Sequence, residues 1–189
     1  MNTKINTKRK RVKFASDNVT GACPEVLEAV IKANDGIVPP YGNDEISGVL
    51  QEKFSKIFEK DVIVYPTASG TASNALALSA ISPSFGNIYC HKFSHINVDE
   101  CGAPEFYTGG AKLVPLNGED GKITTEELKN SIGGFGIVHH TQPSIVSITQ
   151  ATETGEVYTL EQIKNISEIT HKHNLKTVSY THLRAHETQ

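Results

Sequence analysis

The chain has 189 residues, of which 38% are hydrophobic, and a formal net charge of −3. This length predicts one ordinary core. The sequence has no run of about 18 apolar residues, which excludes a membrane span, and its polar start lacks the apolar stretch of a secretion signal. These features predict a cytoplasmic protein. Cys23, Cys90 and Cys101 fit neither a disulfide framework nor a CxxC metal site, which predicts reduced thiols.

The charge is unevenly distributed along the chain. Residues 4–13 contain six of the 18 basic residues and no acid, which leaves 12 basic and 21 acidic residues elsewhere, a formal charge of −9. Because a body of this charge would repel a phosphate backbone, we expect no nucleic-acid partner. We interpret residues 1–13 as a short solvated basic arm, with a nucleic-acid or localisation patch as the alternative.

Helical and strand patterns alternate through the rest of the chain. Apolar residues at spacings of three and four predict helices over 24–34 and from about 46 to 58. The run 62–65 predicts a strand, followed by a helix from about Thr71. Capping-box patterns at Thr124 and Thr159 predict two more helices. Further strands are predicted at 87–92, 111–117, 144–149 and 175–179. This alternation favours an α/β fold with a mostly parallel sheet flanked by helices, whose ligands lie beyond the carboxyl ends of the strands.

The segment TASGTASN passes from the first predicted strand to a helix through Ser69, Gly70 and Thr71. Unpaired backbone N–H groups and the positive end of the helix dipole meet there, which favours an anion. Gly70 lets a phosphate approach the backbone, and the two hydroxyls can donate hydrogen bonds. Simple capping of the helix is the alternative. Because the nucleotide patterns GxxxxGK[ST] and GxGxxG are absent, a small phosphorylated ligand is the better candidate.

Histidines follow the next predicted strand, in the segment HKFSHINVDECGA. The spacing of His91 and His95 does not match a zinc motif, so we expect no metal. A histidine there is either a hydrogen-bonded structural residue or a ring that stacks on an aromatic ligand. We interpret His171 and His173, at the end of the last predicted helix, as solvated.

Together these segments resemble the amino-terminal half of a threonine aldolase of the β-eliminating lyase family, a pyridoxal-phosphate enzyme of fold type I. The resemblance runs from about Phe14 to Thr177. It rests on five segments in the right order: FASDNVTGACPEVLEAV, PPYGNDEISGVLQEKF, TASGTASN, SHINVDECGA and SIVSITQATETGEVYTLEQI. It implies that residues 14–177 form an incomplete cofactor-binding large domain, and that the full-length protein is a homodimer or homotetramer with a small amino-acid substrate.

The resemblance also assigns roles to single residues. Ser69, Gly70 and Thr71 would hold the cofactor phosphate, and His95 would lie over the pyridine ring. Glu100 would lie in the pocket wall and position water or a proton. Ser16 would help to bind the substrate carboxylate. The loop from Tyr41 to Asp44 would lie near the active site and reach toward a dimer interface, and Gln150 and Thr152 would border the pocket.

The implied chemistry is cleavage of a carbon–carbon bond. A β-hydroxy amino acid joined to the cofactor as an imine loses its Cα–Cβ bond because the ring accepts the electron pair. A base removes the hydroxyl proton, which gives glycine and an aldehyde, acetaldehyde in the case of L-threonine. His95 is a candidate for that proton transfer, directly or through water. Ring stacking without proton transfer is the alternative.

The chain departs from the family after Thr177. Threonine aldolases carry Asp-Gly-Ala-Arg after this strand, for the pyridine nitrogen and the substrate carboxylate, and a later Schiff-base lysine. Here the sequence continues as VSYTHLRAHETQ, with neither. We interpret residues 178–189 as a non-native tail on a truncated reading of a longer gene, and expect the chain alone to be inactive. The alternatives are another pyridoxal-phosphate-dependent β-eliminating lyase or aminotransferase, or a non-catalytic module that binds a phosphorylated ligand.

Overall fold

The computed structural model describes residues 21–181, in two compact units that adjoin in the sequence between Val64 and Tyr65. The first unit holds two helices, α1 (Pro24–Ala33) and α2 (Glu45–Ile57). Pro24 starts α1, where its missing N–H costs nothing. Asp44 caps α2 by accepting from the Ser47 N–H at 2.9 Å. Both helices follow the predicted patterns, but neither buries a residue.

The predicted strand over 62–65 is wrong: these residues have no regular secondary structure and pair with no strand of the described chain. Side chains of α2 hold the backbone instead. The Val64 N–H donates to Gln51 Oε1 at 3.1 Å, and the Val62 N–H donates to Ser55 Oγ at 3.2 Å. An apolar run shows only that a segment can be buried in a sheet. The segment becomes a strand only if a neighbouring strand has free backbone N–H and C=O groups to pair with it.

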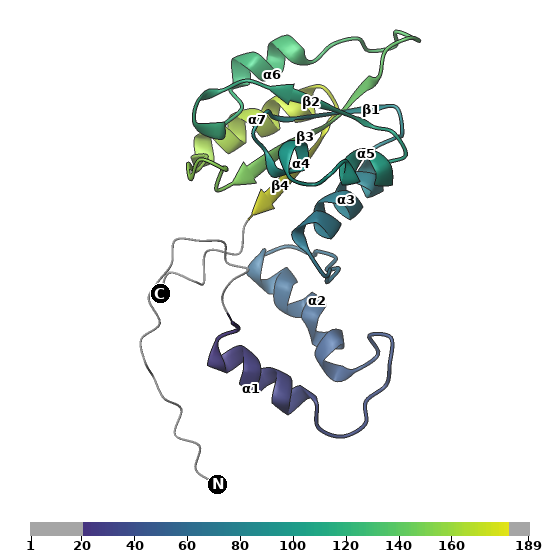
Figure 1. The fold of residues 1–189 in the computed structure, drawn as a ribbon, viewed down its shortest axis with the longest axis vertical. Helices are drawn as coiled ribbons and strands as arrows, with labels where there is room; N and C mark the ends of the chain where they lie inside the picture. Colours follow the sequence, from purple (N-terminus) through teal and green to yellow (C-terminus); the bar gives the residue numbers. More distant parts are fainter. Residues whose placement is uncertain (1–20, 182–189) are drawn as a thin grey trace. The chain divides into compact units, whose positions relative to one another are not determined.

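A four-stranded parallel sheet forms the centre of the second unit (Figure 1). The strands are β1 (Gly86–His91), β2 (Lys112–Leu116), β3 (Gln142–Gln150) and β4 (Lys176–Thr181), in the order β2-β1-β3-β4. Each lies within two residues of a predicted strand, so the parallel α/β prediction is confirmed. Residues 178–181 belong to β4 and pair with β3, with Val178 opposite Ser147.

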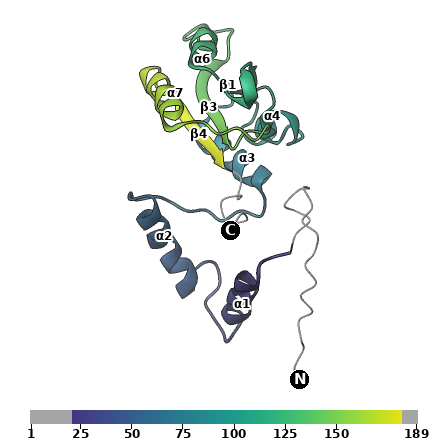
Figure 2. The same ribbon diagram turned by 90° about the vertical axis from the view of Figure 1, so that its left-hand side faces the viewer.

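Helices cover both faces of this sheet, because alternate strand residues point to opposite sides. On one face Tyr89 and Val146 pack with Leu128 of α6 (Thr125–Ser131) and Ile166 of α7 (Leu160–Lys172). On the other face Ile88, Cys90 and Ile145 pack with Leu78 of α3 (Gly70–Ile81) and Ile96 of α4 (His95–Val98). Figure 2 shows α7 and α4 on opposite sides of the strands.

The capping predictions are borne out in different degrees. Thr159 and Gln162 form a complete capping box at the start of α7. Thr124 caps α6 by accepting from the Glu127 N–H, but the Glu127 carboxylate accepts from the Asn117 N–H instead of completing the box. No helix between residues 21 and 181 is both long and apolar enough to cross a bilayer.

Candidate functional site

The turn predicted to hold a phosphate lies at the start of the twelve-residue helix α3. Ser69 is the N-cap residue, and its hydroxyl accepts from the Ala72 N–H at 3.2 Å. The N–H groups of the first helical turn, which include those of Gly70 and Thr71, have no acceptor inside a helix and carry the positive end of its dipole. The structure thus combines both readings of this turn: Ser69 caps the helix, and the turn can still receive an anion.

Gly70 leaves room for a close approach by another group. A Cβ atom at this position would overlap the phenol oxygen of Tyr180, which is the second-to-last residue of β4. The Tyr180 ring lies beside the imidazole of His95, with centroids 6.1 Å apart and the planes tilted by 31°. Tyr180 therefore places an oxygen at the phosphate turn and an aromatic ring near His95. These are the two contacts that a phosphorylated aromatic ring would make.

His95 begins the short helix α4, which follows β1. Its Nδ1 lies 2.7 Å from Glu100 Oε1, and the side chain of Asn74, on α3, donates to the same oxygen at 2.6 Å. The Glu100 side chain is fully buried, whereas the His95 side chain is 27% exposed. The second carboxylate oxygen, Oε2, is buried without a hydrogen-bond partner among residues 21–181. A buried oxygen in that state favours a donor from a ligand or a water molecule.

The other histidines have separate surroundings. His91 is buried, and its ring nitrogens bond the Gly118 carbonyl at 3.2 Å and the Phe93 N–H at 3.1 Å. Both of its ring nitrogens are therefore occupied, as in a structural residue. His171 is exposed, as expected, and His173 is partly exposed, but the His173 ring also stacks on Phe135 with centroids 6.0 Å apart, a contact that was not predicted. The pattern of α7 gave no sign of that contact because Phe135 lies in a distant loop.

The structure gives no contact that bears on the predicted roles of Ser16 and Tyr41, and it gives Gln150 a structural role. Ser16 lies outside the described residues. Tyr41 belongs to the first unit, in a turn with φ 63° where it is 97% exposed. The Gln150 side chain bonds both backbone groups of Tyr158, and so closes a loop. The roles given to Ser16 and Tyr41 stay predictions.

The Thr152 side chain, like that of Gln150, bonds backbone groups of a loop. Its hydroxyl donates to the Asp120 carbonyl at 2.8 Å and accepts from the Glu156 N–H at 3.2 Å, and the residue is buried. These bonds connect the loop after β3 to the loop after β2. They give Thr152 a structural role, and its place at a pocket rim stays a prediction.

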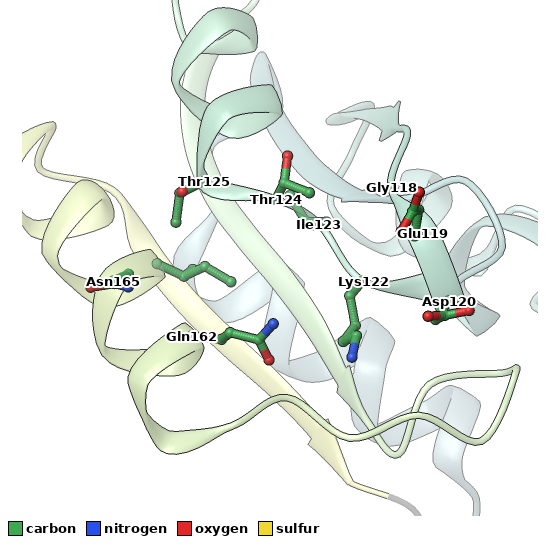
Figure 3. A pocket seen from close by; sticks show the side chains of 10 residues that line it. Gly118, Glu119, Asp120, Lys122, Ile123, Thr124, Thr125, Gln162 and Asn165 are labelled. Carbon is green, nitrogen blue, oxygen red and sulfur yellow. The ribbon is translucent and has the colours of Figure 1, made fainter.

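A cavity of about 670 Å³ lies elsewhere, between the loop after β2 and the first turns of α7 (Figure 3). None of the predicted site residues lines it. Two of its polar side chains already have structural partners: Lys122 pairs with Glu156 at 3.3 Å, and Gln162 completes the capping box. Anion-binding geometry and a polar atom without a partner meet at Gly70 and Glu100, so we place the candidate site there.

Sequence reasoning missed two residues of this site, Asn74 and Tyr180. Asn74 precedes the apolar run 75–78 of α3 and is buried with Ala75 and Leu78, and an amide at the start of that run was the available signal. Tyr180 lies just after the predicted strand over 175–179, and no sequence pattern near it indicates a contact with residues 70 or 95. Its proximity comes from the pairing of β4 with β3.

Comparison with known proteins gives consistent results. The family model of the beta-eliminating lyases matches residues 13–179. The chain is 42% identical over 154 residues to the low specificity L-threonine aldolase of Pseudomonas sp. (strain NCIMB 10558), and 40% identical over 154 residues to that of Pseudomonas aeruginosa. Each match covers 82% of this chain and 44% of the relative. The chain therefore spans about half the length of these relatives.

Solved structures show the same fold. The threonine aldolase of Leishmania major matches with a TM-score of 0.79 and 24% identity, over 85% of this chain and 47% of that chain. The alanine aminotransferase of Pyrococcus furiosus matches with a TM-score of 0.57 and 17% identity, over 82% of this chain and 39% of that chain. At this level of identity, the likeness shows only that the sheet and helices are arranged in the same way.

Proposed function

Because the chain belongs to the beta-eliminating lyase family, whose members depend on pyridoxal phosphate, we propose that it carries the phosphate-binding part of a threonine-aldolase-like lyase. Its fold is part of the large domain of fold type I pyridoxal-phosphate enzymes. The proposed reaction cleaves β-hydroxy amino acids such as L-threonine into glycine and an aldehyde. Cytoplasmic location, and assembly of the full-length protein as a homodimer or homotetramer, are parts of the same proposal.

The residues of the candidate site fit the cofactor. Gly70 and Thr71 would bind the phosphate with their backbone N–H groups, and the hydroxyls of Thr71 and Ser69 would add hydrogen bonds. The phenol oxygen of Tyr180 lies against Gly70, and so marks a place at the start of α3 that a phosphate oxygen would fit. The Tyr180 ring likewise stands in for an aromatic ring beside His95. This pair of contacts is the observation that carries the proposal.

When bound, pyridoxal phosphate supplies an electron sink for the pair left on Cα. The chain's own residues would orient the amino acid and move the proton of its β-hydroxyl. A ring whose Nδ1 donates to Glu100 keeps its lone pair on Nε2, and that atom of His95 can accept the proton directly or through water. His95 acting only as a stacking ring is the alternative.

Glu100 would serve this transfer without touching the carbon skeleton. Its Oε1 already accepts two hydrogen bonds, so Oε2 is the atom left to hold a water molecule or to receive a proton. Ser16 and Tyr41 complete the proposal as residues for the substrate. Another pyridoxal-phosphate-dependent lyase or aminotransferase is the second candidate, because the phosphate turn and stacking ring would serve it equally.

The first test is binding of pyridoxal phosphate to the 189-residue chain, followed by ligand absorbance and by competition with inorganic phosphate. Thr71→Val removes one hydroxyl at the turn, and we expect about a tenfold weaker affinity, the effect of one good hydrogen bond to a charged group. Thr125→Val makes the same change at the 670 Å³ cavity and should leave affinity unchanged. Loss of binding in Thr125→Val, with Thr71→Val unaffected, would move the site to the cavity.

We further propose that the 189-residue chain alone does not catalyse the reaction, because no lysine follows Lys176 and no aspartate follows Thr177. Incubation with L-threonine and pyridoxal phosphate should then give no acetaldehyde above the protein-free rate. Sustained acetaldehyde release would contradict this part and leave the binding proposal standing. A pure binding module, the remaining alternative, predicts saturable binding with the same absence of product.

A further inference from the structure

One buried carboxylate connects two parts of the site. Glu100 Oε1 accepts from Asn74 Nδ2 at 2.6 Å and lies 2.7 Å from His95 Nδ1. Asn74 and Glu100 are each only 3% exposed. The three residues come from three segments: Asn74 from α3, His95 from the start of α4, and Glu100 from the turn after α4.

Hydrogen-bond chemistry fixes the direction of these contacts. Asn74 Nδ2 can only donate, so its bond to Oε1 has one direction. A carboxylate has no hydrogen to donate, so in that form Glu100 also accepts from His95 Nδ1. The neutral His95 ring then carries its hydrogen on Nδ1 and its lone pair on Nε2. Both bonds are short and charge-assisted, which makes them stronger than bonds between neutral groups.

An asparagine at position 74 destabilises the helix unless its hydrogen bond to Glu100 compensates. Asparagine is a weak helix former, and its buried amide costs free energy when it has no partner. The same helix face is otherwise apolar, with Ala75 and Leu78 buried beside it. A small apolar residue would suit the helix better, so the amide is explained by what it donates to.

We propose that Asn74 is a positioning residue: through Glu100 it holds the His95 ring in the Nδ1-protonated tautomer, with Nε2 as the proton-accepting atom. Without the amide, Glu100 loses one of two anchors and is free to turn about its side-chain bonds. The same change removes one of the two donors to Oε1, so the carboxylate is no longer held toward Nδ1. The use of this tautomer in catalysis rests on the proposed function, whereas its existence in the free chain does not.

The experiment measures the tautomer of His95 in the full 189-residue chain without any ligand. Histidine labelled with ¹⁵N reports by NMR which ring nitrogen carries the hydrogen, and the His95 signals are assigned by their loss in His95→Gln. We expect the Nδ1–H form to predominate. Asn74→Ala should lower the ratio of Nδ1–H to Nε2–H by about tenfold or more, the effect of losing a hydrogen bond to a charged group.

Two further variants separate donation from packing. Asn74→Leu keeps about the size of the side chain but has no donor, so it should lower the ratio as much as Asn74→Ala. Ser79→Ala removes a polar group from the same helix, where Ser79 bonds only the Leu76 carbonyl in the described contacts, and should match the parent chain. Parent-like ratios in both folded Asn74 variants would overturn the proposal. A parent-like ratio in Asn74→Leu alone would overturn it as well if Asn74→Ala does not fold.

The result is independent of whether the chain binds pyridoxal phosphate. If the tautomer ratio responds to Asn74 but no ligand binds, the positioning network stands and the proposed function fails. If pyridoxal phosphate binds with unchanged affinity and the ratio ignores Asn74, the proposed function stands and the positioning role fails.

Discussion

At the scale of single residues, Tyr180 determines how open the candidate site is. Its phenol oxygen lies against Gly70 and its ring beside His95, so a phosphorylated ligand must displace it. Tyr180→Ala should therefore raise the affinity for inorganic phosphate by about tenfold, the equivalent of one contact of roughly 1.4 kcal/mol. Isothermal titration measures this change.

The matched variant Tyr180→Phe keeps the ring and removes only the oxygen at the phosphate turn. If the oxygen is what competes, Tyr180→Phe should recover most of the gain for phosphate, because phosphate does not need the space beside His95. Weaker phosphate binding in both variants would show that Tyr180 supports the turn instead of covering it.

At the scale of elements, β1 is buried on both faces and protects its cysteine. Cys90 is fully buried, and burial raises the pKa of its thiol from 9.0 to about 11. A raised pKa means that the folded state keeps the proton: this stabilisation is complete below about pH 9 and is lost as the pH rises through about 11. Near neutral pH the thiolate fraction is about a hundredfold lower than in the unfolded chain.

A thiol-reactive reagent at pH 8 should therefore modify the exposed Cys23 and Cys101 quickly and Cys90 only slowly, whereas all three react quickly in denaturant. Cys90→Ala should keep two fast thiols and remove the slow one. Three equally fast thiols in the native chain would show that β1 is not packed between the two helical layers.

At the scale of the whole molecule, the first unit has apolar side chains without a core. α1 and α2 bury no residue, and Leu27, Val30 and Ile31 on α1 are each at least half exposed. Exposed apolar faces of this kind favour association. We expect the 189-residue chain to elute with a mass above the 20.5 kDa of a monomer in size exclusion with light scattering.

Ile31→Lys places a charge on that apolar face and should shift the chain toward monomer. Glu28→Lys adds a lysine outside the Leu27, Val30 and Ile31 face and should leave the association intact. A chain that is monomeric and unfolds cooperatively at micromolar concentration would contradict this prediction.

The sequence predicted the elements whose signals are local. The strands of the sheet and the capping box at Thr159 depend on neighbouring residues and formed as predicted, and Ser69 caps α3, which was the alternative reading of its turn. The predicted strand over 62–65 did not form, because no neighbouring strand pairs with it in the described chain, and an apolar run does not indicate whether such a neighbour exists. Tyr180 and the stacking of His173 were missed for a related reason: both contacts join segments far apart in the sequence.

The shared oxygen of Glu100 also makes two events interdependent. Asn74 lies about one turn along α3 from Gly70, so the helix that would receive an anion at its start is connected by one carboxylate to the His95 ring. A ligand that orders the first turn of α3 should then favour the fixed ring, and by thermodynamic reciprocity a fixed ring should tighten the hold on the ligand. Phosphate recognition and ring orientation would thus be cooperative over one short helical segment, with Glu100 as the coupling element.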